Sequence, residues 1–569
     1  MMWFIEDPAR SRQERRLLEE FVGSVDWLNA IGWRIDDSAR LVWDADLTVG
    51  SEVRKISLRF PNNFPYSPPL VLPRDKDAYW SSHQYGRGGE LCLEYGPDNW
   101  RETISGADMV QSAYRLLTGE MGEARGGPAV PSRHVTTIGA SVRGNYLRYV
   151  FDLEAQAYLA SLPEGTVSLG SELNLWQGSG VTKLLWDAKS PEWKNPTLSK
   201  ALDRNGFRLE VAIVKLPDGA RQAIPKTASA LLHDLQSSSL EVGDARTIVL
   251  VQGERISAVE IDRNADTVES IAVIRQPKSA SRLSRDHQAL SQKRVAIIGC
   301  GSLGSKIAVS LARSGVRSFV LMDEDIFLPE NTVRNDLDWR DVGNHKVDSV
   351  AARIELVQPT ATSRKYRRML GGQGSSGAIE GLLDILADCD LIVDATAEPA
   401  AFNVLSSIAK ISAKPAIVWG EVFGGGIGGM MARYRSLLEP GPLTMRQRID
   451  AWCASQGAPI PETVVPYGTD EGDPHIADDT DVSTIAGLTA SFCVDTLLHR
   501  EPSHYPFSAY LIGLRRAWIF SQALEVRPID VGAPDEMDKP PVDPGAIREE
   551  LMTIGELLGK HRDANSSGT

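Results

Sequence analysis

Hydrophobic positions along the chain follow three patterns, one after another. Near the N-terminus, a helix-like run at residues 10–21 is followed by short alternating runs at 40–49 and 53–60, which predict strands. Between about 145 and 280, helical and strand-like runs alternate without a functional motif. From residue 293 the pattern becomes strand, glycine loop, helix and strand, which predicts a βαβ unit and therefore a parallel sheet covered by helices.

Turn-forming and linker-like segments divide the chain into four parts. A proline-dense corner, FPNNFPYSPPLVLP, interrupts the first part, and a Gly/Pro-rich stretch, GEARGGPAVPS, ends it as a linker. We expect an α+β domain at residues 1–130 and a linker with an α/β connector domain at 131–280. An α/β Rossmann-like domain with a mainly parallel sheet follows at 281–530, and a tail with a short helix at 531–569.

Composition and charge exclude several classes of protein. The 569 residues carry a net charge of −14, which argues against a broad electrostatic grip on nucleic acid. The five cysteines are too sparse for a disulfide scaffold and contain no CxxC pair for a four-cysteine zinc site. The N-terminus is too charged for a signal peptide, and the most apolar stretch, 415–432, is interrupted by Glu421 and rich in glycine. We therefore expect a cytoplasmic protein that binds neither nucleic acid nor a membrane.

The glycine loop of the third part predicts a phosphate site. Gly299, Gly301 and Gly304 directly follow an apolar strand and open a helix, so backbone N–H groups and the helix N-terminus favour a bound anion. Asp323 ends the next strand, where a carboxylate can hold ribose hydroxyls. These residues alone fit an NAD dehydrogenase as well as an ATP-dependent enzyme.

Four residues downstream separate the two classes of enzyme. Asn331, Arg334 and Lys346 supply polar and cationic side chains, and Asp394 ends another buried strand. Hydride transfer has no need of this set. Attack of a carboxylate on the α-phosphate of ATP does need it, because cations offset the triphosphate charge and a carboxylate holds Mg²⁺ against it.

In this order of motifs, residues 280–525 resemble the adenylation domain of the ThiF/MoeB/ubiquitin-activating family. The resemblance implies ATP at the three glycines, ribose at Asp323 and Mg²⁺ at Asp394. It assigns the phosphates to the polar and cationic side chains, which are Asn331, Arg334 and Lys346. The segment SRLSRDHQ looks like the family's arginine-rich lead-in, which implies that Arg285 reaches the nucleotide of a second subunit in a homodimer.

Cys92 is the candidate nucleophile of the first part. Leu91 and Leu93 flank it, so in an extended segment its thiol points away from both leucines. Residues 10–120 resemble a ubiquitin-conjugating enzyme: FPNNFPYSPP looks like that family's proline corner, GGELCLEY matches its active-site segment, and a tryptophan follows at Trp100. The family's His-Pro-Asn is replaced here, since Gln84 and Tyr85 follow His83. His83 or Asn99 is then the candidate oxyanion donor, unless the site depends on another geometry.

Cys453 is a candidate for a second catalytic cysteine, because activating enzymes often carry one in a segment after the metal-binding aspartate. A structural helix cysteine is the alternative. Related bacterial fusions carry a Cys-Gly-x-Pro motif where this chain has EGDP at residues 471–474, so an adenylate passed straight to Cys92 is also open. We expect Cys300, Cys389 and Cys493 to be structural.

The arrangement resembles conjugating–activating fusions of bacterial antiphage (CBASS-type) operons. It implies that ATP activates the C-terminal carboxylate of a separate partner, a ubiquitin-like protein or a cyclic-nucleotide synthase (a nucleotidyltransferase) ending in glycine. The acyl group then passes as a thioester through Cys92 to an amine such as a lysine of a target protein. The alternatives are a ThiF/MoeB-like enzyme of sulfur-carrier chemistry and a catalytically reduced scaffold that binds a ubiquitin-like partner.

Overall fold

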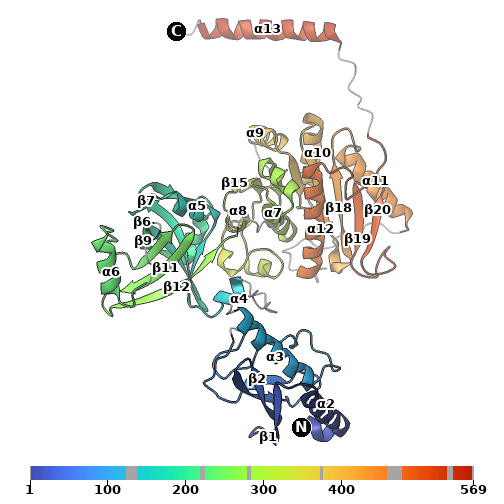
Figure 1. The fold of residues 1–569 in the computed structure, drawn as a ribbon. Helices are drawn as coiled ribbons and strands as arrows, with labels where there is room; N and C mark the ends of the chain where they lie inside the picture. Colours follow the sequence, from blue (N-terminus) through green and yellow to red (C-terminus); the bar gives the residue numbers. More distant parts are fainter. Residues whose placement is uncertain are drawn as a thin grey trace. The chain divides into compact units, whose positions relative to one another are not determined.

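The computed structural model describes residues 2–81, 83–123, 138–217, 219, 224–277, 283–371, 376–457, 477–534 and 543–566. The chain forms two compact units, Met1–Arg143 and Gly144–Thr569. Figure 1 shows them with their helices and strands labelled. Each unit is described by itself.

The first unit is an α+β domain built on a four-stranded antiparallel meander in the order β1-β2-β3-β4. Its elements are α1 (Trp3–Glu6), α2 (Pro8–Ser24), β1 (Leu28–Ile35), β2 (Leu41–Val49), β3 (Glu52–Arg59), β4 (Leu70–Pro73), α3 (Gly106–Glu123) and α4 (Ile138–Val142). The helix expected at 10–21 is confirmed as α2, and the strands expected at 40–49 and 53–60 are confirmed as β2 and β3. One buried cluster joins α2, α3 and the inner face of the sheet, and within it the rings of Trp3 and Phe64 lie 4.6 Å apart.

A buried carboxylate ties the two long helices of this unit together. Glu14 on α2 has no exposed surface, and its Oε2 accepts a hydrogen bond from the N–H of Gly106, the first residue of α3, at 2.8 Å. Arg10 pairs with the other oxygen at 2.8 Å and also donates to the carbonyl of Ile104 at 3.1 Å. A carboxylate at a helix N-terminus satisfies an otherwise unpaired N–H, so this contact fixes where α3 begins.

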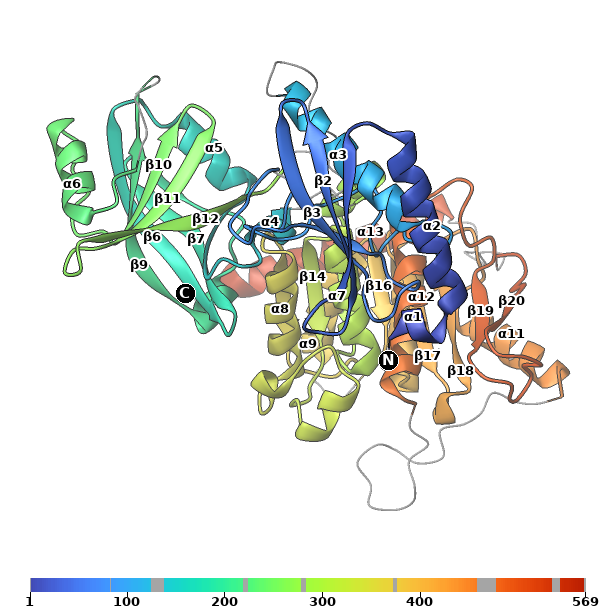
Figure 2. The same ribbon diagram turned by 60° about the horizontal axis from the view of Figure 1, so that its bottom comes forward.

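The second unit begins with a β-barrel. The sheet order is β5-β12-β11-β10-β9-β6-β7-β8, and β5 pairs with β7 as well as β12, which closes the ring. The strands are β5 (Leu147–Phe151), β6 (Thr166–Gln177), β7 (Gly180–Lys189), β8 (Glu192–Lys194), β9 (Gly206–Lys215), β10 (Thr247–Gln252), β11 (Arg255–Asp262) and β12 (Thr267–Arg275). Helices α5 (Leu153–Ser161) and α6 (Ala228–Ser237) and the turn η1 (Lys200–Asn205) complete it, and α6 covers one side of the strands in Figure 2.

This barrel corrects the expected α/β connector. The strand-like runs of 145–275 form mainly antiparallel ladders, such as β6–β7 and β10–β11–β12, instead of strands separated by crossover helices. A charged cluster lies inside: Lys183, 2% exposed, contacts Glu172 at 2.8 Å and Glu260 at 2.9 Å. Lys183 and Glu172 are therefore buried as a pair of opposite charges, while Glu260 is 25% exposed.

The rest of the second unit is a three-layer α/β/α domain. Its sheet has the order β15-β14-β13-β16-β17-β18-β19-β20, parallel from β15 to β17 and antiparallel beyond, as expected of a mainly parallel sheet. The strands are β13 (Arg294–Ile298), β14 (Ser318–Met322), β15 (Thr362–Tyr366), β16 (Leu391–Asp394), β17 (Ala416–Val422), β18 (Gly428–Tyr434), β19 (Ala509–Gly513) and β20 (Glu525–Ile529).

Two buried clusters hold the layers together. Helices α7 (Ser302–Ser314), α8 (Lys346–Val357) and α12 (Asp479–Leu498) pack on one face of the sheet. Helices α9 (Ser376–Ala387), α10 (Pro399–Ile411) and α11 (Pro442–Ser455) pack on the other. The remaining turns are η2 (Arg285–Gln292), η3 (Pro329–Val333), η4 (Trp339–Asp341) and η5 (Gly424–Gly426).

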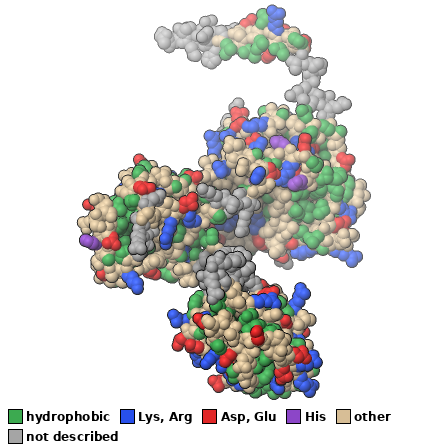
Figure 3. Space-filling view, viewed as in Figure 1, with side chains coloured by type: hydrophobic (Ala, Val, Ile, Leu, Met, Phe, Trp, Pro, Cys, Tyr) green, Lys and Arg blue, Asp and Glu red, His purple; other side chains and the backbone are tan. Residues whose placement is uncertain are grey.

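Helices α12 and α13 are the two long helices at the C-terminal end. Among the described residues, α12 alone is long and apolar enough to cross a membrane, but most of it is buried against α7 and the sheet, as in the core helix of a globular domain. The expected short tail helix is α13 (Pro544–Ser566). Figure 3 shows hydrophobic (green) atoms along the described part of this helix. Its exposed large apolar side chains are Ile547, Leu551, Met552, Ile554, Leu557 and Leu558.

Candidate active sites

The glycine loop joins β13 to α7, as the sequence predicts. Gly299 has φ +86°, a left-handed conformation that disfavours any other residue. A Cβ on Gly304 would lie 1.9 Å from the carbonyl oxygen of Gly299, so this glycine allows the helix to pack on the loop. A Cβ on Gly301, in contrast, would meet no atom within 4 Å. Gly301 is the glycine whose missing side chain leaves open space.

Asp323 holds this loop from the neighbouring strand β14. Its Oδ2 accepts a hydrogen bond from the N–H of Cys300 at 2.7 Å, and its Oδ1 accepts one from the N–H of Asp325 at 2.9 Å. Burial raises the pKa of Asp323, although these N–H groups and the Lys346 cation lower it. The Asp323 carboxylate therefore stabilises the glycine loop and also lines the cavity beside it.

A cavity of about 740 Å³ opens over the loop and the strand ends. Six of the seven expected nucleotide-binding residues line it: Gly299, Gly301, Asp323, Asn331, Arg334 and Lys346. Gly304, packed behind the loop, is not among the lining residues. The structure thus brings together residues that are up to 47 positions apart (346 − 299) on one side of the sheet.

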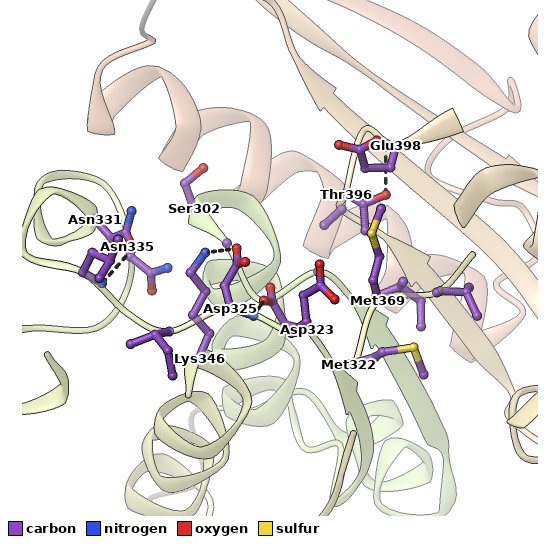
Figure 4. A pocket seen from close by; sticks show the side chains of 18 of the residues that line it. Ser302, Met322, Asp323, Asp325, Asn331, Asn335, Lys346, Met369, Thr396 and Glu398 are labelled. Atoms are coloured by element: carbon purple, nitrogen blue, oxygen red, sulfur yellow. Dashed lines mark hydrogen bonds and ion pairs between the residues drawn. The ribbon is translucent and has the colours of Figure 1, made fainter. Parts of the chain in front are cut away.

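Lys346 and Asn331 are each held by a neighbour. The Lys346 Nζ lies 2.6 Å from Asp325 Oδ2, and Figure 4 shows this pair beside Asp323. Asn331 Oδ1 accepts a hydrogen bond from the N–H of Leu328 at 3.0 Å, which closes the η3 turn. The Lys346 side chain is 12% exposed, and its cation is thus paired with the Asp325 carboxylate at the cavity wall.

Asp394 ends β16 next to the cavity, although its neighbours Ala395 and Thr396 form the lining. Its carboxylate is 4% exposed, and Oδ1 accepts hydrogen bonds from the N–H and the hydroxyl of Thr396 at 3.0 and 2.7 Å. Burial raises the pKa of Asp394. A buried carboxylate gains from a nearby cation, so the residue fits a metal ligand. The described residues hold no group of three metal-binding side chains.

Several lining residues carried no signal in the sequence. Arg368, Met369 and Leu370 follow β15, and Glu398 follows β16. In Figure 4, Met322 and Met369 lie near each other, and Glu398 lies across the cavity from Asn331. They belong to no compact motif, so only the parallel order of β13, β14, β15 and β16 could have placed them at this edge. Arg285, on η2, is exposed and does not line the cavity.

Cys92 lies in the first unit, just after a glycine hairpin. An isolated antiparallel bridge joins Gln84 to Leu91, and the glycines at 86, 88 and 89 make the turn between them. A Cβ on Gly89 would lie 1.8 Å from the carbonyl oxygen of Tyr85, so the turn is tight. Leu91 and Leu93 are buried while Cys92 is half-buried, which confirms that the thiol side differs from the leucine side.

Two amides, one on either side of Cys92 in the sequence, bond to the backbone. Asn99, a candidate oxyanion donor, donates from Nδ2 to the carbonyl of Glu94 at 2.9 Å and accepts from the N–H of Gly96 at 2.9 Å. Gln84, 8% exposed, accepts from the N–H of Trp80 at 2.9 Å and donates to the carbonyl of Ala78 at 3.0 Å. Both amides therefore shape the loops around the thiol.

The other four cysteines are buried. Cys453 on α11 has no exposed surface and packs in the core between α10, α11 and the sheet. Burial raises its pKa to about 11. The structure therefore favours the alternative of a structural cysteine, because a buried, protonated thiol is a poor nucleophile. Cys300, Cys389 and Cys493 are also fully buried, and the EGDP segment at 471–474 lies outside the described residues.

Comparisons with known proteins agree with this geometry. The model of the ThiF family matches residues 276–472. The uncharacterized protein y4qC of Sinorhizobium fredii (strain NBRC 101917 / NGR234) is 33% identical over 409 residues, covering 63% of this chain and 67% of y4qC. The chain belongs to the same family as y4qC and carries a ThiF-family domain.

Shorter matches reach proteins with named activities. The ATP-dependent ubiquitin transferase-like protein Cap2 of Vibrio cholerae serotype O1 is 33% identical over 125 residues, covering 21% of this chain and 20% of Cap2. The adenylyltransferase and sulfurtransferase uba4 of Aspergillus fumigatus (strain CBS 144.89 / FGSC A1163 / CEA10) is 33% identical over 129 residues, covering 22% of this chain and 25% of uba4. This chain thus matches a quarter or less of either relative.

Solved structures give a weaker likeness. The crystal structure of E. coli MccB with ATP is 16% identical, covers 46% of this chain and 68% of that chain, and has a TM-score of 0.34.

Proposed function

We propose that this protein uses ATP to adenylate the C-terminal carboxylate of a separate protein, captures the acyl group as a thioester on Cys92 and transfers it to an amine. The observation that carries the proposal is the cavity at the glycine loop. The open backbone at Gly301, the carboxylate of Asp323 at a strand end and the Lys346 cation paired with Asp325 all lie at this cavity. A phosphate-binding backbone next to lysine and arginine side chains suits a triphosphate.

The first step is binding of ATP. The open space at Gly301 admits a phosphate to the N–H groups at the start of α7, where the helix dipole also favours negative charge. Asp323 accepts hydrogen bonds from the ribose hydroxyls, and Asn331 and Arg334 reach the phosphates. Lys346 exchanges Asp325 for a phosphate oxygen, since both are anions at the same wall.

Asp394 is the proposed ligand of Mg²⁺. The metal, when bound, would offset charge on the triphosphate. An oxygen of the partner's carboxylate forms a bond to the α-phosphorus, the bond from that phosphorus to the β-phosphate bridging oxygen breaks, and pyrophosphate leaves. Asp394 is suited to this because it is buried beside the lining residues, and its hydrogen bonds from Thr396 hold the carboxylate in one orientation. Glu398 lines the same side of the cavity.

The second step forms the thioester. The Cys92 sulfur attacks the acyl carbon, the bond from that carbon to the phosphate oxygen breaks, and AMP leaves. Cys92 is the one half-exposed thiol of the five, and the glycine hairpin before it presents backbone without side chains. An amine, such as the side chain of a target lysine, then displaces the thiol.

The partner and the assembly are parts of the same proposal. The substrate is a separate ubiquitin-like protein or nucleotidyltransferase with a C-terminal glycine, and the setting is bacterial antiphage defence, as the resemblance to conjugating–activating fusions implies. The similarity to a protein described as ATP-dependent and ubiquitin transferase-like supports the transfer chemistry. A homodimer through the ThiF-family domain would bring the exposed Arg285 of one subunit to the nucleotide of the other.

Sulfur-carrier chemistry is the second candidate function. The match to a protein described as an adenylyltransferase and sulfurtransferase favours it. It uses the same nucleotide cavity and differs in one respect, because it gives Cys92 no part in the reaction. The two functions therefore separate on a substitution of this cysteine.

The test compares variants of the full chain produced in its native host. On a non-reducing gel, we expect an ATP-dependent adduct that a thiol reagent removes. It should disappear in Cys92→Ala and in Lys346→Ala, and should persist in Lys410→Ala, which removes an exposed lysine of α10 away from the cavity. An ATP-dependent adduct that persists in Cys92→Ala would refute the thioester step. An adduct insensitive to Lys346→Ala would refute the assigned nucleotide site.

A further inference from the structure

The hairpin before Cys92 brings His83 next to it on the opposite strand. The N–H of Cys92 donates to the carbonyl of His83 at 2.6 Å, and the N–H of Tyr85 donates to the carbonyl of Glu90 at 3.0 Å. These two bonds flank the Gln84–Leu91 bridge on either side. The N–H of His83 donates instead to the Oγ of Ser81 at 2.9 Å, so a single backbone bond joins residues 83 and 92. That bond places the two residues opposite each other across the hairpin, where the Cα atoms of such a pair lie about 5.5 Å apart.

Alternation along the ladder decides which side these residues face. Gln84 and Leu91 point into the domain, being 8% and 5% exposed. Successive side chains of a strand point to opposite faces, so His83 and Cys92 share the other face. Both are half-buried, in agreement with this. Opposed side chains on one face lie within reach of each other, since their Cβ atoms are about 4.5–5.5 Å apart.

We propose that His83 is the proton acceptor of Cys92, so that the two form a Cys–His pair. This inference rests on the proposed role of Cys92 as a nucleophile. The neutral imidazole takes the proton from Sγ as the sulfur forms its bond to the acyl carbon. AMP leaves with the electron pair of the broken C–O bond, and the imidazolium returns its proton to water once the thioester is made.

The charged groups described near the pair come from its own segment, from β3 and from α3. Glu90 and Glu94 share the face of Cys92 by alternation, and Tyr85 shares that of His83. Arg59 on β3 attracts Glu90, whose pKa is raised by burial, and Arg115 on α3 lies 3.2 Å from Glu94. Each acid on this face therefore has a cation from a neighbouring element, which leaves His83 as the base for the thiol.

The accessibility of the cysteines makes a direct measurement possible. The other four thiols are fully buried, so iodoacetamide added to the native full chain should alkylate Cys92 alone. The alkylation rate follows the thiolate fraction. We expect the midpoint of its pH profile in His83→Ala to lie about one pH unit or more above that of the parent protein, as expected when a thiolate loses a histidine partner.

Two further variants define the role. His83→Gln keeps a polar side chain that cannot accept a proton, so its midpoint should match that of His83→Ala. His233→Ala, which removes an exposed histidine of α6 in the second unit, should leave the profile unchanged. Thermal unfolding checks that each variant is folded.

Two results would overturn the proposal. One is a parental midpoint in folded His83→Ala. The other is a parental midpoint in His83→Gln alone, because a hydrogen-bonding role would then suffice. Neither result depends on ATP or on a partner, so failure of this pair is distinguishable from failure of the proposed transfer reaction, which the Cys92→Ala adduct tests separately.

Discussion

The two glycines at 301 and 304 offer a matched pair of substitutions with opposite expected effects. An added Cβ at Gly304 lies 1.9 Å from the Gly299 carbonyl oxygen and 3.2 Å from the Ala395 Cβ. Relief requires a shift of more than about 1 Å in a loop whose own glycine already has positive φ. Overpacking of this kind costs about 1–3 kcal/mol or more, and a gain of about 1 kcal/mol in helix propensity offsets part of it.

Gly301→Ala meets no such obstacle. Its Cβ has open space, and φ −73° is accessible to alanine, which also gains about 0.4–1 kcal/mol from a less flexible unfolded chain. Gly301 is the N-cap of α7, where alanine is poorer than glycine, so the two effects offset each other and the variant should be about as stable as the parent. The same methyl group occupies the space that a phosphate needs to reach the backbone. We therefore expect Gly301→Ala to bind ATP at least about tenfold more weakly, a loss of about 1.4 kcal/mol or more.

The assay combines thermal unfolding with equilibrium binding of a fluorescent ATP analogue. Gly304→Ala should lower the unfolding temperature without ligand by several degrees, at about 2–4 °C per kcal/mol for a domain of this size, while Gly301→Ala should not lower it. Parental affinity for ATP in Gly301→Ala would refute the idea that phosphate approaches the backbone there. An unchanged unfolding temperature in Gly304→Ala would refute the close packing of the loop.

Three further predictions concern buried groups. Cys453→Ala should leave the thiol-sensitive adduct at its parental yield on a non-reducing gel; loss of the adduct would restore this cysteine as a catalytic candidate. Lys183→Met should destabilise the second unit by about 3–5 kcal/mol in thermal unfolding, because the Glu172 carboxylate stays buried without its cation, and adding Glu172→Leu should recover most of the loss. No recovery in the double variant would contradict this. Burial raises the pKa of Asp495, but its hydrogen bonds and the Arg433 cation outweigh burial and lower it. The stability that this lowered pKa gives is complete above the ordinary carboxyl pKa and is lost as the pH falls through the lowered pKa. The unfolding temperature of Asp495→Asn should therefore lie below the parent's at pH 7 and approach it below about pH 4. A constant difference in unfolding temperature at every pH would contradict the assignment.

The glycine loop and the parallel strands around it were predictable because their signals are local. A short apolar strand, glycines at fixed spacing and a helix define the loop at Gly299, Gly301 and Gly304 within a few residues. The carboxyl ends of parallel strands meet at one edge, which also brought Asp323 to the cavity, and Lys346 lines it from the first turn of α8. Arg368 and Glu398 were not predicted as cavity-lining residues, because nothing in their local sequence distinguishes them from surface charges.

The barrel and the Cys92 hairpin show why other parts were not predictable. The barrel closes through pairing of β5 with β7 and β12, whose residues are far apart in the chain, and alternation within single strands does not determine such partners. The opposition of His83 and Cys92 depends on hairpin register, which the positive-φ glycines at 86 and 88 determine. The sequence shows the glycines but not which residues they bring face to face.

The most direct test of the central claim is the mass of the tryptic peptide 88–101, which contains position 92. The Cys92→Ser variant of the full chain is purified from its native host, where an acyl group captured by the hydroxyl is held as a more stable ester. We predict that this peptide carries the C-terminal residues of a partner protein, and that the modification is absent when Lys346→Ala is added. An unmodified peptide, from a preparation in which a partner's C-terminus is found adenylated, would contradict the account.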